Sequence, residues 1–174
     1  MIFTQYTLKL PIIIYVFFIL TSCTNTENDK KQLIYIKSKS SGTYIEVLNK
    51  SLQDKERIVA NEFNESISQQ WYLEKIDSNV YCLKSRLSGL AIDCKNGSKD
   101  RHSLLLQYKY CGNDNQKIQL ISKGDYYQFI FLHSGMAIEI PYGSDDNNVC
   151  LFQNLVSGAD NQLWSLIPVD KVKR

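Results

Sequence analysis

The sequence contains little proline, little histidine and no large excess of charge of either sign. Among 174 residues there are 3 prolines and 8 glycines, too few for long disordered stretches. The net charge of +2 at pH 7 is too small to bind nucleic acid or an anionic membrane through bulk charge. No Cys-x-x-Cys pair or Cys/His spacing typical of zinc occurs, so we expect no metal or other cofactor.

Motifs of hydrolytic enzymes are also absent. The chain has no Gly-x-Ser-x-Gly and no His-Glu-x-x-His, and His102 and His133 have no plausible nucleophile to assist. Asp93 and Asp114 could in principle act as a pair of glycosidase carboxylates, but no further motif supports that role. We therefore expect that the chain is not an enzyme.

No apolar run near the N-terminus is long enough to cross a bilayer. Leu10–Leu20 has 11 residues and follows a single charge, Lys9. That length is typical of the apolar core of a signal peptide. The segment Leu20–Cys23 (Leu-Thr-Ser-Cys) resembles a bacterial lipobox, in which the cysteine is acylated and becomes the mature N-terminus. An ordinary signal peptide with a chance cysteine is the alternative.

These features predict how the protein is exported and held. Residues 1–22 are expected to form a lipoprotein signal peptide, and residues 23–32 the lipidated Cys23 with a polar tether. The protein then sits in the bacterial cell envelope, at the outer membrane or cell surface, attached to the membrane by its lipid anchor. Export implies an oxidising compartment. The remaining cysteines allow three pairings, among which the sequence does not choose (Cys82, Cys94, Cys111, Cys150).

An internal threefold repeat fills the rest of the chain. A glutamine followed two residues later by a large apolar residue occurs three times, with the glutamines 47 and 46 residues apart (Gln69–Trp71, Gln116–Ile118, Gln162–Trp164). Each copy is preceded by Ser-Gly-x-x-Ile and an acid, and 22 positions always separate that acid from the residue before the glutamine (Ser41–Glu46, Ser88–Asp93, Ser134–Glu139). Several landmarks in one register argue for three copies of one structural unit.

Each copy has the pattern of short β-strands. Apolar side chains alternate at Tyr81 and Leu83 and again at Tyr127 and Phe129, the period of a half-buried strand. The Ser-Gly pair supplies a turn because glycine accepts a positive φ. The pattern predicts an all-β fold of three pseudo-symmetric four-stranded units, about twelve strands in a closed barrel with hairpin caps. One unit cannot bury its own apolar face, whereas three packed around an axis can.

These repeats resemble those of the ricin-type β-trefoil lectin family. The resemblance covers residues 33–168, in units of about 33–79, 80–125 and 126–168, with a tail at 169–174. It implies a β-trefoil fold and one carbohydrate-binding domain. It also assigns the large apolar residue of each repeat to the core, where burial of such a side chain contributes about 1.5–3 kcal/mol (Trp71, Ile118, Trp164).

The resemblance also implies where sugar binds. Sugar hydroxyls need directional partners, and the C–H face of the ring needs a flat apolar surface. The family supplies an acid after the second strand, an aromatic residue on the third strand and an asparagine before the glutamine. In the middle unit these are Asp93, Tyr108, Asn115 and Gln116, and Leu106 adds a main-chain contact. The alternative for each residue is a structural role, since such an Asp often satisfies turn amides.

The two outer units depart from the family. The third unit offers a candidate site with Glu in place of the usual Asp, which moves the carboxylate outward (Glu139, Phe152, Asn161, Gln162). In the first unit all three positions differ, so no sugar site is expected there (Glu46, Asn61, Ser68). By the same resemblance Cys111 lies near a bridging cysteine whose usual partner position is Ala91. Cys94 is the nearest substitute, and a Cys94–Cys111 disulfide is expected.

The function implied by the resemblance is a surface-anchored lectin that binds glycans without catalysis and prefers a galactose-like sugar. The alternative is a cell-binding or scaffolding subunit of a multi-protein complex such as a toxin. In that case the trefoil would contact another protein, with Tyr126 and Tyr127 available for the interface.

Overall fold

The structure is a computed structural model that describes residues 31–172 of the chain. The expected signal peptide, Cys23 and most of the tether lie outside the described residues. Within them the regular elements are antiparallel strands and short 3-10 turns, which confirms the all-β prediction. Lys31 and Gln32, assigned to the tether from the sequence, already belong to the first strand. No helix among residues 31–172 has the length and hydropathy needed to span a membrane.

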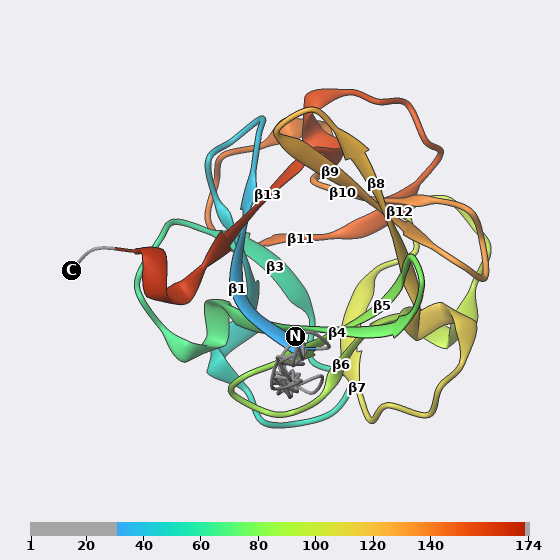
Figure 1. The fold of residues 1–174 in the computed structure, drawn as a ribbon, viewed down its shortest axis with the longest axis horizontal. Coiled ribbons are helices and arrows are strands. Elements are labelled where there is room, and N and C mark those ends of the chain that lie inside the picture. The colour runs from blue at the N-terminus through green and yellow to red at the C-terminus, as the bar shows by residue number, and fades with distance from the viewer. Residues whose placement is uncertain (1–30, 173–174) are drawn as a thin grey trace, which may run out of the picture.

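Six strands form a closed barrel. They are β1 (Lys31–Ser38), β4 (Gln70–Asp77), β5 (Val80–Ser85), β8 (Ile118–Lys123), β9 (Tyr126–Phe131) and β13 (Trp164–Pro168). Each pairs with the next in this order, and β13 returns to β1. Closure leaves these strands without a free edge. Figure 1 shows the three lobes of the molecule around a central axis.

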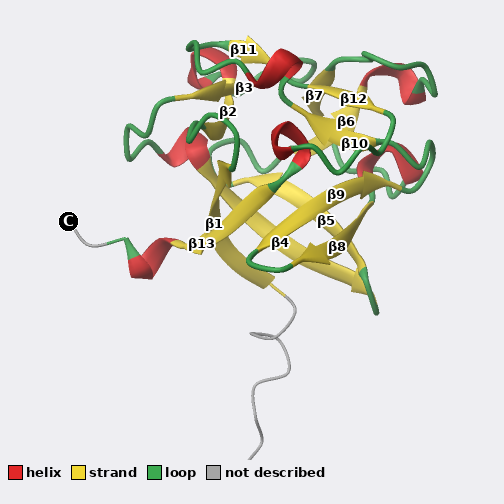
Figure 2. Ribbon diagram, turned by 90° about the horizontal axis from the view of Figure 1, so that it is seen from above, coloured by secondary structure: helices red, strands yellow, loops and turns green. Residues whose placement is uncertain are grey.

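Three hairpins cover one end of the barrel (Figure 2). The first joins β2 (Tyr44–Val47) to β3 (Ile58–Asn61), the second joins β6 (Ala91–Cys94) to β7 (Leu105–Tyr108), and the third joins β10 (Ala137–Glu139) to β12 (Phe152–Asn154). A short strand, β11 (Val149–Cys150), precedes β12 and pairs with β3 instead. The third unit therefore has its third strand in two pieces, and the described residues hold 13 strands rather than the expected twelve.

The third strands of the units also meet one another around the axis. Arg57 pairs with Leu106, Leu104 pairs with Phe152, and Cys150 pairs with Val59. Each unit thus places the start of its third strand against the hairpin of the following unit. Any site on a hairpin is consequently lined by residues from two units.

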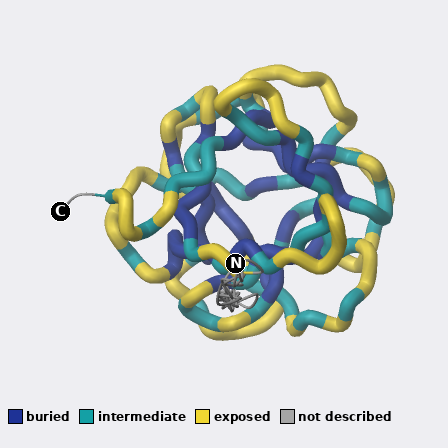
Figure 3. Tube along the Cα trace, viewed as in Figure 1, coloured by how far each residue is buried: buried dark blue, intermediate teal, exposed yellow. Residues whose placement is uncertain are grey.

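The core lies inside this ring. Trp71 and Trp164 have no exposed surface and Ile118 is 3% exposed, so the predicted core residues are confirmed. The indole Nε1 of Trp71 donates to Ile45 O at 2.9 Å, and that of Trp164 donates to Ile138 O at 3.3 Å. Buried indole N–H groups need such partners. Figure 3 shows buried residues on the inner side of the trace and exposed ones on the outer loops.

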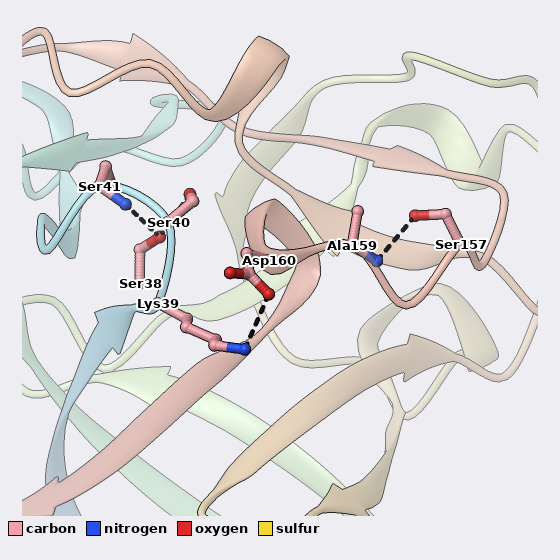
Figure 4. A network of polar contacts seen from close by, with 7 residues as sticks. All are labelled: Ser38, Lys39, Ser40, Ser41, Ser157, Ala159 and Asp160. Carbon is pink, nitrogen blue, oxygen red and sulfur yellow. Dashed lines mark hydrogen bonds and ion pairs between the residues drawn. The ribbon is translucent and has the colours of Figure 1, made fainter.

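The first and third units are fastened together where the repeats meet. The turn after β1 and the 3-10 turn Asp160–Gln162 are joined by an ion pair, with Lys39 Nζ 2.8 Å from the carboxylate of Asp160 (Figure 4). The backbone N–H of Lys39 also donates to Leu163 O at 2.9 Å. This contact joins the beginning of the domain to its end.

The expected Cys94–Cys111 disulfide is wrong. Cys82, Cys94, Cys111 and Cys150 are all free thiols. Successive side chains of a strand point to opposite faces. Asp93 faces the surface loop that carries Cys111, and Cys94 therefore points the other way, into the core. The Sγ of Cys94 contacts Ser98 O at 3.6 Å, whereas the exposed Cys111 contacts Lys109 O at 3.3 Å.

Candidate functional site

The acid and the glutamine of each repeat form the same buried pair in all three units. The distances from glutamine Nε2 to the carboxylate are 3.1 Å for Gln69–Glu46, 2.9 Å for Gln116–Asp93 and 2.6 Å for Gln162–Glu139. The other amide hydrogen of each glutamine goes to a main-chain carbonyl after the third strand. Each Oε1 accepts a backbone N–H from the same loop. Both hydrogens of each amide are thus in use inside the protein.

This pairing changes the role of two predicted site residues. Gln116 and Gln162 are 2% and 0% exposed, and neither has a hydrogen left to offer a ligand. They position the carboxylate and tie down the loop that follows the third strand. The spacing of 23 residues from acid to glutamine (93 to 116, 139 to 162) is the sequence signal for this structural pair.

In the middle unit the acid keeps free acceptor positions. Asp93 Oδ1 accepts from Asn115 Nδ2 at 2.9 Å, and Oδ2 accepts from Gln116 Nε2 at 2.9 Å. Because each carboxylate oxygen has two lone pairs, each retains one acceptor position. Asn115 Nδ2 also donates to Cys94 O at 3.1 Å, and no donor among residues 31–172 bonds to the side-chain oxygen of Asn115. Three acceptor positions therefore lie side by side.

In the third unit the protein fills three of the four acceptor positions of the acid. Asn154 Nδ2 reaches both oxygens of Glu139, at 3.1 and 3.2 Å, and Gln162 takes the second oxygen as well. Asn161 donates to Ile140 O at 3.1 Å. Glu46 in the first unit is covered in the same manner by Asn61, Asn64 and Ser68.

The strand register explains the difference between the units. Tyr108 pairs with Ala91 in the middle hairpin, and the residue that pairs with the equivalent Ala137 in the third hairpin is Asn154. The sequence-based choice of Phe152 as the aromatic counterpart of Tyr108 is therefore wrong by two residues. Phe152 stands opposite Glu139, where the middle unit has Leu106 opposite Asp93. The ring of Phe152 packs against His102, with centroids 4.9 Å apart.

A cavity of about 800 Å³ opens at the middle unit. It brings together the predicted residues Asp93, Tyr108, Asn115 and Gln116, and Leu106 also lines it. It also contains residues that the sequence comparison did not single out, among them Lys55 and Arg57 from the first unit and Lys95 and Asn96 from the turn after β6. A unit-by-unit comparison could not find Lys55 and Arg57, because they enter the site from the neighbouring repeat.

Burial shapes the chemistry of Asp93. Asp93 is only 8% exposed, and desolvation raises the pKa of its carboxyl to about 6. The hydrogen bonds from Gln116 and Asn115 act in the opposite direction but are the smaller effect. At pH 7 the group is mostly ionised and accepts hydrogen bonds only. Such a partly desolvated carboxylate is a strong acceptor for hydroxyl donors.

A closed barrel with three hairpin caps, and an acid–glutamine pair in each cap, defines a β-trefoil protein. The family described as "Ricin-type beta-trefoil lectin domain-like" matches residues 18–108 and 114–173, and this chain belongs to that family. None of the curated proteins matches the chain. No three His, Cys, Asp or Glu side chains gather as a metal site would require anywhere in residues 31–172.

Solved structures share the fold. The designed threefold-symmetric protein ThreeFoil is 32% identical, with a TM-score of 0.77 over 78% of this chain and 97% of its own. An exo-β-1,3-galactanase from Clostridium thermocellum is 30% identical, with a TM-score of 0.77 over 79% of this chain, but this chain spans only 30% of that enzyme. A Macrolepiota procera ricin B-like lectin in complex with lactose is 13% identical. Its TM-score is 0.68, and the match covers 79% of this chain and 95% of that lectin.

Proposed function

We propose that this protein is a lectin that binds a terminal galactose-like sugar in the cavity of its middle unit, without catalysis. The observation that carries the proposal is the difference between the three acids. Asp93 keeps acceptor positions open beside an aromatic ring, whereas Glu46 and Glu139 are covered by neighbouring side chains. The 30%-identical galactanase and the family resemblance support a galactose-like ligand.

The geometry suggests a mode of binding. Two adjacent ring hydroxyls donate to the two oxygens of Asp93, and the side-chain oxygen of Asn115 accepts from a further hydroxyl of the sugar. The ring of Tyr108, half-buried at the end of β7, packs on the apolar face of the sugar. A shallow site of this kind binds with a Kd near 1 mM, or about −4 kcal/mol. Many copies on one surface then raise the effective affinity.

We further propose that the lectin is displayed on the bacterial envelope through a lipid on Cys23. One acyl chain gives only marginal attachment, whereas two or more hold firmly. Display in many copies fits a weak individual site. Protein–protein recognition by the trefoil is the competing function.

The test is titration of the purified protein with lactose, together with thermal melts. Tyr108→Ala should abolish measurable binding while the melting temperature changes little, because Tyr108 is not part of the core. Tyr142→Ala is the matched control, since this aromatic side chain is fully exposed and does not line the cavity. Tyr108→Ala binding as well as the wild type would contradict the proposed site. A wild type that binds no glycan on a broad array would favour the protein-interaction function.

A further inference from the structure

The cavity of the middle unit carries an excess of positive charge. Its lining includes Lys55, Arg57 and Lys95, and Asp93 is the only carboxylate that residues 31–172 contribute to it. The ion pairs among residues 31–172 join other lysines to Glu74, Asp160 and Asp114, and none involves the three cations of the cavity. Like charges gathered without counter-charges attract an anion to the cleft.

One of these cations lies beside the ring of Tyr108, and a second lines the same cavity. Lys55 Nζ lies 6.0 Å from the centroid of the Tyr108 ring. Arg57 Nη1 lies 3.8 Å from Cys150 Sγ and meets no carboxylate. The nearby Glu56 makes no ion pair with Arg57 among the ion pairs of residues 31–172, and its Oε1 accepts from the backbone N–H of Arg57 at 3.0 Å. Lys55 and Arg57 are both exposed and can reach a ligand in the cavity.

The strand pairing separates the positive and negative parts of the site. Asp93 pairs with Leu106, and Leu106 pairs with Arg57, so the three residues lie in a row across neighbouring strands. Two strand spacings put the Cα atoms of Asp93 and Arg57 about 10 Å apart. A ligand can therefore give its hydroxyls to Asp93 while a second group lies against Lys55 and Arg57. An anionic group at that second position is repelled less by Asp93 than it would be beside the carboxylate.

Only the middle site has this pair of cations. The counterparts of Lys55 in the other units are His102 and Asn148. All three have a positive φ, of 64° at Lys55, 63° at His102 and 61° at Asn148. Arg57 corresponds by strand pairing to Leu104 and Cys150. The two cations thus occur together at the one unit whose acid is open to a ligand.

From this coincidence we infer that the glycan bound at the middle unit is acidic, with a carboxylate or sulfate seated against Lys55 and Arg57. The inference rests on the proposed lectin function and adds the chemical class of the ligand. It requires no bond making or breaking. The anion and the sugar hydroxyls are recognised at opposite sides of one cavity.

The experiment compares three probes by titration at low ionic strength: lactose, lactose sulfated on its galactose, and digalacturonic acid. Either acidic probe should bind at least fivefold more tightly than lactose. The advantage should shrink when the salt concentration is raised from 0.02 to 0.5 M, because exposed charges are screened. Preference for the sulfated or the carboxylate probe identifies which anion the site takes.

Variants assign the effect to the two cations. Lys55→Gln and Arg57→Gln should each lower the ratio of acidic to neutral affinity about three- to fivefold, in line with the strength of exposed ion pairs. Arg57→Lys should retain most of the ratio. Lys123→Glu, which alters the net charge at the β8–β9 turn away from the cavity, should leave the ratio unchanged.

Different results would overturn the acidic-ligand inference and the lectin function. Equal affinity for lactose and both acidic probes would overturn the inference and leave the lectin function standing. A ratio unaffected by Lys55→Gln and Arg57→Gln would also overturn it. Absence of binding to every probe would overturn the lectin function and the inference with it.

Discussion

Acidification should weaken binding of a neutral sugar through Asp93. Burial raises the pKa of this carboxyl to about 6, so the ionised fraction falls from roughly nine-tenths at pH 7 to roughly one-tenth at pH 5. Only the carboxylate accepts hydrogen bonds from two hydroxyls at once. If the ionised form alone binds, the Kd for lactose should rise about tenfold between pH 7 and pH 5.

The same linkage predicts proton release. Hydroxyl donors favour the carboxylate, so bound lactose should lower the pKa of Asp93 and release about half a proton per site at pH 6. Calorimetric titration in buffers of different ionisation enthalpy measures this number directly. His102→Asn is the control, because it replaces a histidine that does not line the cavity.

The effect on folding has the opposite sign. The pKa of Asp93 is raised from 3.8 to about 6 on folding, so the folded protein binds the proton more tightly than the unfolded chain. The contribution of Asp93 to the unfolding free energy is therefore greatest below pH 3.8 and declines as the pH rises to about 6. Sugar binding is therefore favoured in the pH range where Asp93 contributes least to the unfolding free energy. A Kd that varies less than twofold between pH 5 and pH 7, or a dependence lost in His102→Asn, would refute this role of Asp93.

Three further outcomes are expected. Trp164→Ala should lower the unfolding free energy by about 3–5 kcal/mol in denaturant titrations, because it empties a fully buried core position; a loss below 1 kcal/mol would contradict that placement. Iodoacetamide should label the exposed Cys111 in the native protein, whereas Cys82 and Cys94, whose burial raises the pKa of each thiol to about 12, should react only after unfolding; mapping that finds Cys94 disulfide-bonded would contradict the structure. Cys23→Ala should abolish fatty-acid labelling and membrane attachment in cells; equal labelling of wild type and variant would end the lipobox hypothesis.

The predictability of the fold came from repetition. One Gln-x-apolar segment carries little information, but three at spacings of 47 and 46 residues, each at a constant distance from an upstream acid, define the unit and its number of copies. The placement of Trp71, Ile118 and Trp164 in the core followed from the same register. So did the grouping of Asp93, Tyr108 and Asn115, because these residues belong to one hairpin and the loop after it.

Three features depended on how strands pair and which way side chains point. A break at Leu151 divides the third strand of the third unit, and the pairing there puts Asn154, not Phe152, at the position of Tyr108. Alternation along β6 turns Cys94 into the core and away from Cys111. All three features require the register or direction of one strand against another, which spacing along the chain does not specify.

The sequence by itself determined the trefoil and the identity of the candidate unit, since repeated spacing encodes repeated local structure. Only the tertiary structure decided which acid stays open. Glu46 and Glu139 are closed by Asn61 and Asn154 from the paired strand, and Asp93 is open because Tyr108 stands in that place. Only the tertiary structure brought cations of the first unit into the middle site, because the third strands of different units meet around the axis and residues far apart in the chain become neighbours.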